Sequence, residues 1–149
     1  IYTLSLHDAL PISYSSKWHA HSVKNKKGVA LERIDPDAAT QDAANWTSAS
    51  ETVGYGTPGY QNSQYKDASS GGATGIEPPV WIEESGSYTV SYLLDRPGYS
   101  CRAFVFNTSG LRVADISNHE LLGISGKITW SGVANNGSPL QTGVYIFYA

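Results

Sequence analysis

Apolar and aromatic side chains alternate with polar ones near the C-terminus, and this alternation constrains the fold most strongly. Ile128 and Trp130 alternate along one run, and a second run of β-branched and aromatic residues spans 144–148. An Asn136-Gly137 pair, typical of a tight turn, lies between the two runs. A period of two gives a helix no apolar stripe but suits a half-buried strand. The pattern predicts a β-hairpin here and a fold built on sheets.

The same period-two pattern recurs upstream and predicts three further strands, at residues 88–94, 101–106 and 111–116. Turns separate them at residues 96–98 and 107–110, which combine Pro or Asn with Gly. Fifteen Gly and seven Pro in 149 residues also imply many turns. We therefore expect an all-β fold.

The first half of the chain carries weaker strand signals. Residues 18–23 and 29–34 flank a basic turn and predict a hairpin. Residues 64–79 are rich in Ser, Gly, Ala and Pro and predict a flexible linker. The linker would separate two small β units, residues 14–63 and residues 80–149.

Residues 1–12 resemble the frame translation of a common sequencing adapter, whose final base would begin the codon of Ser13. A chance match over so many consecutive codons is implausible, so we interpret residues 1–13 as an artefact of sequence assembly. We expect the natural polypeptide to begin near Ser13 or Tyr14, and we expect the chain to be a fragment at both ends.

Composition argues against several classes of protein. The formal net charge is −3 and no basic block is longer than residues 24–27, so nucleic acid is not an expected partner. The single cysteine, Cys101, cannot form an internal disulfide, and the alternation points its side chain at the core. No run of apolar residues is long enough for a membrane span.

Candidate metal ligands each have a plain structural alternative. His19 and His21 would face one side of a strand and could share a metal ion, but a third ligand is not evident. A calcium loop needs a central Gly and a Glu at position twelve. The acidic segment contains Asp35, Asp37 and Asp42, and position twelve counted from Asp35 is Trp46 instead of Glu. We therefore predict no metal site.

Candidate catalytic groups are equally sparse. Cys101 has no His beside it in the sequence, and Glu83 and Glu84 are neighbours on an expected strand, where they would face opposite sides. We therefore assign no catalytic residue and no cofactor. Four aromatic side chains would make a carbohydrate-binding surface if they lay on one face, although each could equally cover the neighbouring core: Tyr55, Tyr60, Tyr65 and Trp81.

The first β unit resembles the closing half of a bacterial lamin tail domain. The likeness covers roughly residues 14–63 and rests on four segments in the same order: Gly28-Val29-Ala30-Leu31-Glu32-Arg33-Ile34, Asn45-Trp46, Ser48-Ala49 and Gly56-Thr57-Pro58-Gly59-Tyr60-Gln61-Asn62. The resemblance implies part of an immunoglobulin-like β-sandwich whose first strands are missing.

The second β unit resembles the immunoglobulin-like domain of the flagellar hook capping protein, the FlgD type. The likeness covers nearly all of residues 80–149 and rests on these segments: Tyr92-Leu93-Leu94, Val105-Phe106-Asn107, Gly110, Gly126, Trp130-Ser131-Gly132, Asn136-Gly137 and Gly143-Val144-Tyr145-Ile146. The resemblance implies an immunoglobulin-like antiparallel β-sandwich, a module also found near the C-termini of secreted, surface-displayed bacterial proteins.

Together the two resemblances imply non-catalytic C-terminal modules of a secreted or cell-surface bacterial protein. Such modules would act as a spacer, an anchor, an adhesion module or an export-related scaffold for upstream domains, with a cell-surface or carbohydrate ligand as a further partner. The alternative is a pair of accessory modules that hold the substrate of an extracellular hydrolase or nuclease.

Overall fold

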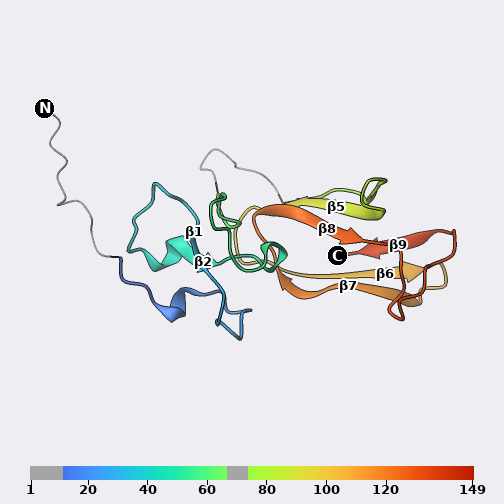
Figure 1. Cartoon of the computed structure of the whole chain (residues 1–149), viewed down its shortest axis with the longest axis horizontal. Helices are drawn as coiled ribbons and strands as arrows, with labels where there is room; N and C mark the ends of the chain where they lie inside the picture. Colours follow the sequence, from blue (N-terminus) through green and yellow to red (C-terminus); the bar gives the residue numbers. More distant parts are fainter. Residues whose placement is uncertain (1–11, 67–73) are drawn as a thin grey trace, which may run out of the picture.

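The computed structural model describes residues 12–66 and 74–149, and within these residues the protein is built almost entirely of antiparallel strands. Two units lie one after the other along the long axis of the molecule (Figure 1). The smaller contains the N-terminal described residues, and the larger is a two-layered sandwich. Residues 1–11 of the segment interpreted as adapter lie outside the described residues.

The sandwich has the all-β, immunoglobulin-like architecture that the sequence predicts, with two sheets packed face to face. In the first sheet, the central strand β5 has β8 along one edge and both β3 and β4 along the other. In the second sheet, β6 lies between β7 and β9. Figure 1 shows β5 and β8 in one layer, with β6 and β7 in the other. The strand bounds are β3 (Gly75–Ile76), β4 (Val80–Ile82), β5 (Ser87–Leu93), β6 (Ser100–Asn107), β7 (Arg112–Leu121), β8 (Ser125–Trp130) and β9 (Tyr145–Tyr148).

The core lies between these layers and follows the predicted alternation. Every second residue of the central strands faces the opposite sheet, so β-branched, aromatic and small side chains interlock there. The buried cluster consists of Val90, Tyr92, Leu94, Cys101, Ala103, Leu122 and Ile128. The inward orientation predicted for Cys101 is confirmed.

The hairpin predicted at the C-terminal end is wrong. Strand β8 pairs with β5 and strand β9 pairs with β6, so the two runs lie in opposite sheets. The turn at Gly137 does form, with φ +79° and its N–H donated to the carbonyl of Ala134, but it belongs to the connection between layers. A hairpin would place Ile128 and Phe147 in one layer, whereas in the sandwich each covers the apolar face of the other sheet.

The N-terminal unit contains one short pair of strands, β1 (Leu31–Arg33) with β2 (Trp46–Ser48), and three 3₁₀ turns: η2 (Ser16–Trp18), η3 (Ala43–Asn45) and η4 (Glu51–Val53). The hairpin predicted between residues 18–23 and 29–34 is wrong. No helix within residues 12–66 and 74–149 is long and apolar enough to cross a membrane.

Side-chain contacts replace the ladder that the sequence predicts for residues 18–23. The Trp18 ring stacks on Trp46 with centroids 5.9 Å apart, and the backbone N–H of Ala20 donates to Oγ of Ser48 over 3.1 Å. The segment therefore attaches to β2 through a ring contact and a bond to a side chain of β2, and β1 takes the edge of β2 instead.

One buried carboxylate organises the N-terminal unit. Glu32 on β1 is 3% exposed and accepts three hydrogen bonds. The donors are the Thr57 hydroxyl at 2.5 Å, the Ser63 hydroxyl at 2.7 Å and the backbone N–H of Gln64 at 3.1 Å. A buried charge is tolerated only when its oxygens are satisfied in this way. Glu32 therefore fixes the backbone course of residues 57–64 against β1.

The segment that Glu32 fixes also carries the contact with the sandwich. The carbonyl of Ser63 accepts from the backbone N–H of Ile124 over 2.9 Å, and Nε2 of the fully buried Gln64 donates to the carbonyl of Leu122 over 3.0 Å. The Ser50 hydroxyl donates to the carbonyl of Leu121 over 3.0 Å. Because these bonds use backbone groups of the sandwich, they hold the two units in a defined orientation.

A glycine permits this close approach. A Cβ atom on Gly123 would lie 2.7 Å from the carbonyl oxygen of Ser63, a separation that real side chains do not tolerate. Backbone therefore meets backbone at the junction of the two units.

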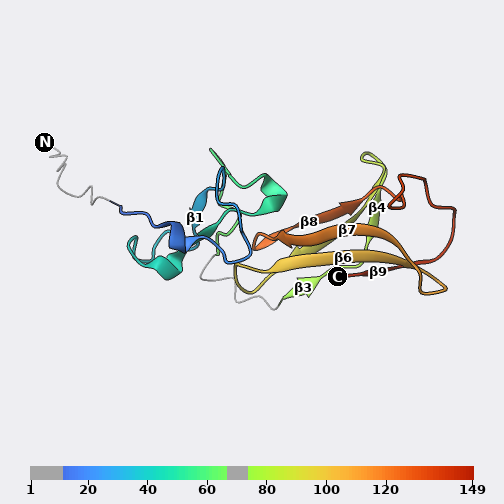
Figure 2. The same ribbon diagram turned by 90° about the horizontal axis from the view of Figure 1, so that it is seen from below.

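The range predicted as a flexible linker, residues 64–79, is packed at both ends. Gln64 is buried at the junction, and Gly75–Ile76 forms strand β3 against β5. Figure 2, seen from below, shows β3 in place beside the sandwich. Residues 67–73 lie outside the described residues.

We expect Glu32→Gln to destabilise the protein. Glutamine has the shape of Glu but no charge, so the charge-assisted hydrogen bonds from Ser63 and Gln64 become weaker neutral ones, at a cost of about 1–3 kcal/mol in the free energy of unfolding. Urea denaturation measures this loss. The matched control is Glu77→Gln, because Glu77 is exposed, and equal stability of the two variants would contradict the role given to Glu32.

We expect Gly126→Ala to destabilise the sandwich. A Cβ atom at this position of β8 would lie 2.7 Å from Cζ of the buried Tyr92, so the ring would have to move within a packed core. Overpacking of this kind costs about 1–3 kcal/mol, measurable by urea denaturation. Gly75→Ala is the control, because its added Cβ meets open space; a neutral Gly126→Ala would show that the ring is not held there.

Candidate functional site

An open groove lies between the two layers of the sandwich, and it is the best candidate for a binding site. It has a volume of about 700 Å³, within the range of small-ligand sites. Its floor is formed by three buried residues of β5, β6 and β8: Val90, Val105 and Ile128. One wall is the sheet of β4, β5 and β8, and the other is β9 with the preceding loop, residues 131–144.

A row of aromatic rings crosses three strands along the first wall. Trp81 of β4 is the cross-strand partner of Tyr88 of β5, which is in turn the partner of Trp130 of β8. The Trp81 and Tyr88 rings meet edge to face with centroids 5.0 Å apart, and the Tyr88 and Trp130 rings stack at 5.7 Å. Cross-strand aromatic pairs of this kind stabilise a sheet and leave ring area facing the groove.

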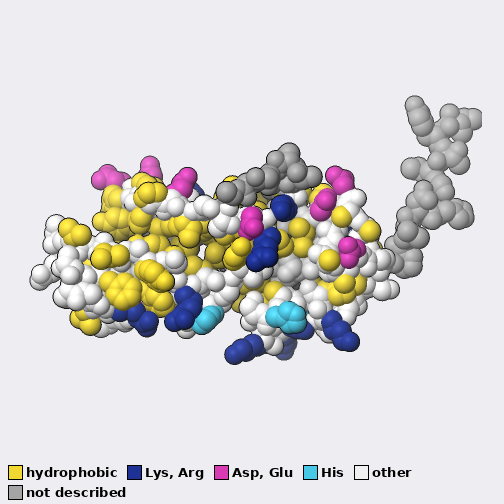
Figure 3. All heavy atoms as spheres, turned by 180° about the vertical axis from the view of Figure 1, so that it is seen from behind, with side chains coloured by type: hydrophobic (Ala, Val, Ile, Leu, Met, Phe, Trp, Pro, Cys, Tyr) yellow, Lys and Arg dark blue, Asp and Glu magenta, His cyan; other side chains and the backbone are white. Residues whose placement is uncertain are grey.

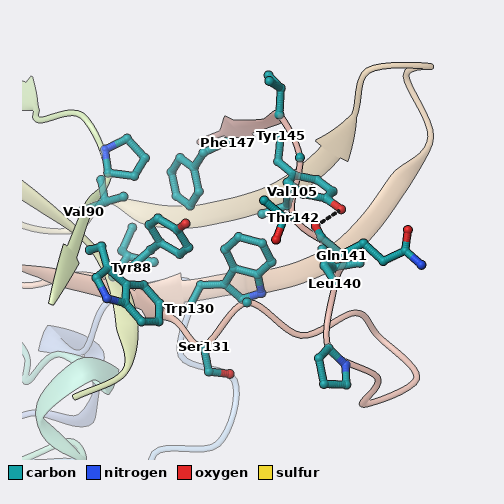
Figure 4. Close-up of a pocket in the computed structure, with 17 residues that line it drawn as sticks. Tyr88, Val90, Val105, Trp130, Ser131, Leu140, Gln141, Thr142, Tyr145 and Phe147 are labelled. Carbon is teal, nitrogen blue, oxygen red and sulfur yellow. Dashed lines mark hydrogen bonds between the residues drawn. The ribbon is translucent and has the colours of Figure 1, made fainter. Parts of the chain in front are cut away.

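The opposite wall completes an aromatic lining. Tyr145 of β9 contacts Trp130 edge to face with centroids 6.5 Å apart. Figure 4 shows Trp130 and Phe147 projecting from facing strands toward one space. The rings therefore line an open groove.

Hydrogen bonds fix two of these rings. The Trp130 indole N–H donates to the carbonyl of Val133 over 2.9 Å, and the Tyr145 hydroxyl donates to the carbonyl of Gln141 over 2.9 Å, the dashed line in Figure 4. The loop of residues 131–144 is itself held to β7, because Asn135 donates its N–H to the carbonyl of Val113 over 3.0 Å. Both walls of the groove are thus anchored.

The groove has polar groups but no charged ones. Among the described residues that line it, none carries a carboxylate, imidazole, ammonium, guanidinium or thiol. Its polar atoms come from the indole of Trp81, the tyrosine hydroxyls, and the side chains of Ser131, Gln141 and Thr142. Such a lining can bind and orient a neutral ligand, and among the described lining residues its hydroxyls have no carboxylate or imidazole beside them that could activate them.

The His pair does not form a metal site among the described residues. No group of three or more His, Cys, Asp or Glu side chains there is arranged to hold a metal ion. Nδ1 of His19 is hydrogen-bonded to Oγ of Ser48 at 2.9 Å. Burial, and after it the charge of Lys26, lower the pKa of His19 below its usual range.

The acidic residues serve local backbone structure. Oδ1 of Asp35 accepts from the N–H of Asp37 over 2.8 Å, and Oδ1 of Asp42 accepts from the N–H of Ala44 over 2.9 Å. These are the side-chain-to-backbone bonds that Asp makes in turns and at helix caps. Glu83 likewise lies in the turn between β4 and β5, where its carbonyl accepts the N–H of Gly86 over 3.2 Å.

The one thiol is buried and sequestered. Burial raises the pKa of Cys101, and the Ser117 hydroxyl donates to its backbone carbonyl over 3.3 Å. A thiol with a raised pKa is a poor nucleophile at neutral pH, because the thiolate is the reactive form.

The four aromatics proposed as a sugar surface do not come together. Tyr55, Tyr60 and Tyr65 belong to the N-terminal unit, whereas Trp81 lies in the groove of the sandwich. The partners that Trp81 does have, Tyr88 and Trp130, are on two other strands. The alternation does predict that Tyr88 faces the same side as the buried Val90, and that Trp130 faces the same side as the buried Ile128. It does not predict which strands pair, and the pairing is what aligns the three rings.

Comparisons with known proteins add no relatives: no protein-family model matches the chain, and no curated protein matches it.

We expect the imidazole of His19 to titrate below 6.5 in the folded protein. Because the folded state disfavours the protonated ring, the stability contributed by neutral His19 is present above pH 6.5 and is lost as the pH falls below it. A two-dimensional NMR titration of the imidazole signals measures the pKa directly. A value at or above 6.5 would show that the ring is neither buried nor opposed by Lys26.

Proposed function

We propose that this chain is a pair of non-catalytic modules from the C-terminal part of a secreted or cell-surface bacterial protein, in which it acts as a rigid spacer or anchor for upstream domains. The units would be of the lamin tail and FlgD-type immunoglobulin-like kinds that their sequences resemble. Their partners are the upstream domains and a cell-surface structure, and an export-related role is compatible with the same arrangement.

The junction between the two units carries this proposal. A spacer transmits orientation only if its modules do not pivot, and flexible domain pairs are the default when the interface is small and polar. Here hydrogen bonds donated by Ser50, Gln64, Lys66 and Ile124 join the units, and Gly123 lets the backbones touch. The described residues that line the groove include no carboxylate, imidazole, ammonium or thiol, which supports a non-catalytic role.

A second candidate is an accessory module that helps an extracellular hydrolase or nuclease to hold its substrate. The observation that favours it is the open groove lined by Trp81, Tyr88 and Trp130. Exposed aromatic surface in a concave site is typical of ligand binding, and a purely mechanical spacer has no need of it.

Rigidity is tested by measuring the distance between the units in solution. Spin labels attached through Tyr60→Cys and Leu111→Cys, both at exposed positions, in a Cys101→Ala background should give a narrow distribution by pulsed electron paramagnetic resonance. Gly123→Ala should broaden it, because the added methyl separates the backbones.

The matched control is Gly56→Ala, whose added Cβ makes only ordinary contacts within the N-terminal unit. It should leave the distribution narrow. A broad distribution in the chain that retains Gly123 would overturn the spacer role.

A further inference from the structure

We infer that the groove between β5, β8 and β9 binds an uncharged glycan, with pyranose rings lying against Trp81 and Tyr88. The inference deepens the accessory-module candidate above and rests on it. It assigns a ligand class and a place to a site for which the sequence named Trp81 together with three tyrosines that lie in the other unit.

The absence of charge in the lining defines the ligand class. No ionisable group other than tyrosine lines the groove among the described residues, so a charged ligand would lose its hydration without gaining a counter-charge. Lys17 and Lys26 line a different hollow in the N-terminal unit, and Arg102 and Arg112 of the sandwich lie over the Phe104 ring, outside the groove lining. Nucleic acids, phosphorylated ligands and acidic sugars are therefore disfavoured, and neutral ligands fit.

The aromatic row defines the shape of the ligand. Trp81 is 46% exposed and Tyr88 is 40% exposed, although both are large rings on strands. A pyranose ring has an apolar face of C–H groups with hydroxyls around its rim, so it can cover an indole or phenol face while its rim remains hydrogen-bonded. A fully apolar ligand would use the rings and leave the polar rim of the groove unpaired.

That rim carries hydrogen-bonding groups without partners in the described structure. They are the indole N–H of Trp81 and the hydroxyls of Tyr88, Ser131 and Thr142, none of which makes a hydrogen bond to another described residue. The fixed rings, Trp130 and Tyr145, have already used their donors on backbone carbonyls. The open groups belong to the exposed ends of the groove, where the hydroxyls of a sugar would lie.

Pre-formed walls reduce the cost of binding. The loop of residues 131–144 is tied to β7, and the floor is the packed core of the sandwich, so little has to become ordered when a ligand enters.

Figure 3 shows apolar side chains gathered on the surface of the sandwich unit. The edge of β9 offers another way of covering such surface, by pairing with an added strand, but pairing there uses backbone groups and leaves the Trp81 to Trp130 row unoccupied.

The test is a titration of the whole chain with cellohexaose, a neutral pyranose oligosaccharide, followed by calorimetry and by the NMR shifts of the indole N–H signals. We expect saturable binding that moves the signal of Trp81 and leaves that of Trp18 in place. Trp81→Ala should weaken binding about tenfold or more, as truncation of an aromatic anchor does.

Matched variants separate the site from general effects. Tyr88→Ala should weaken binding, whereas Tyr60→Ala, a change of the same kind at an 84% exposed position of the other unit, should not. Thr142→Val removes one hydroxyl of the rim and should also weaken binding. Because Thr142 lies on an exposed loop, this variant keeps the test valid if an aromatic variant fails to fold. A cello-oligouronate, which has the same β-1,4 linkage but a carboxylate at C6, should bind more weakly than the neutral sugar.

Other outcomes overturn the inference. Absence of saturable binding of cellohexaose, or equal binding by Trp81→Ala and Tyr60→Ala, would do so. Concentration-dependent dimerisation lost in Trp81→Ala, or tighter binding of an uncharged β-strand peptide, would assign the groove to a second copy or a peptide instead. The spin-label distances do not depend on sugar binding, so failure here is distinguishable from failure of the spacer role.

Discussion

The arrangement of the whole molecule depends on the carboxylate of Glu32. Its buried oxygens need donors, and they obtain them from Thr57, Ser63 and Gln64, which brings a loop rich in Gly and Pro back across β1. Ser63 and Gln64 in turn present a carbonyl and an amide to the sandwich. The satisfaction of one buried charge thus fixes both the inside of the small unit and its attachment to the large one.

At two glycines the structure leaves no room for a side chain. Gly123 admits the carbonyl of Ser63 at the junction, and Gly126 admits the ring of Tyr92 at the adjacent end of the core. Burial raises the pKa of the Tyr92 hydroxyl, which makes no hydrogen bond of good geometry although Thr52 and Gly123 lie beside it. Core packing and the junction meet at these positions, so stability and relative orientation of the units are coupled there. Neither glycine lines the groove, although Val90 and Ile128 of its floor belong to the same core cluster as Tyr92.

Sequence reasoning succeeded where the signal is local. The alternation in residues 88–94 and 101–106 predicts strands with an inward Cys101, and Asn107 with Gly110 predicts a turn that the structure contains. It failed where the outcome depends on distant partners. The terminal hairpin is split between sheets, and residues 18–23 attach to β2 through Trp18 and Ser48.

By itself, the sequence determined that the chain forms strands and which faces of them are apolar, because side-chain direction in a strand follows from parity alone. Only the tertiary structure decided which strands pair, since pairing depends on contacts between residues far apart in the chain. That choice aligned Trp81, Tyr88 and Trp130 into one row and left a groove beside them. The tertiary structure also buried Glu32, which the sequence does not distinguish from the other acidic residues, and made it the acceptor on which the junction depends.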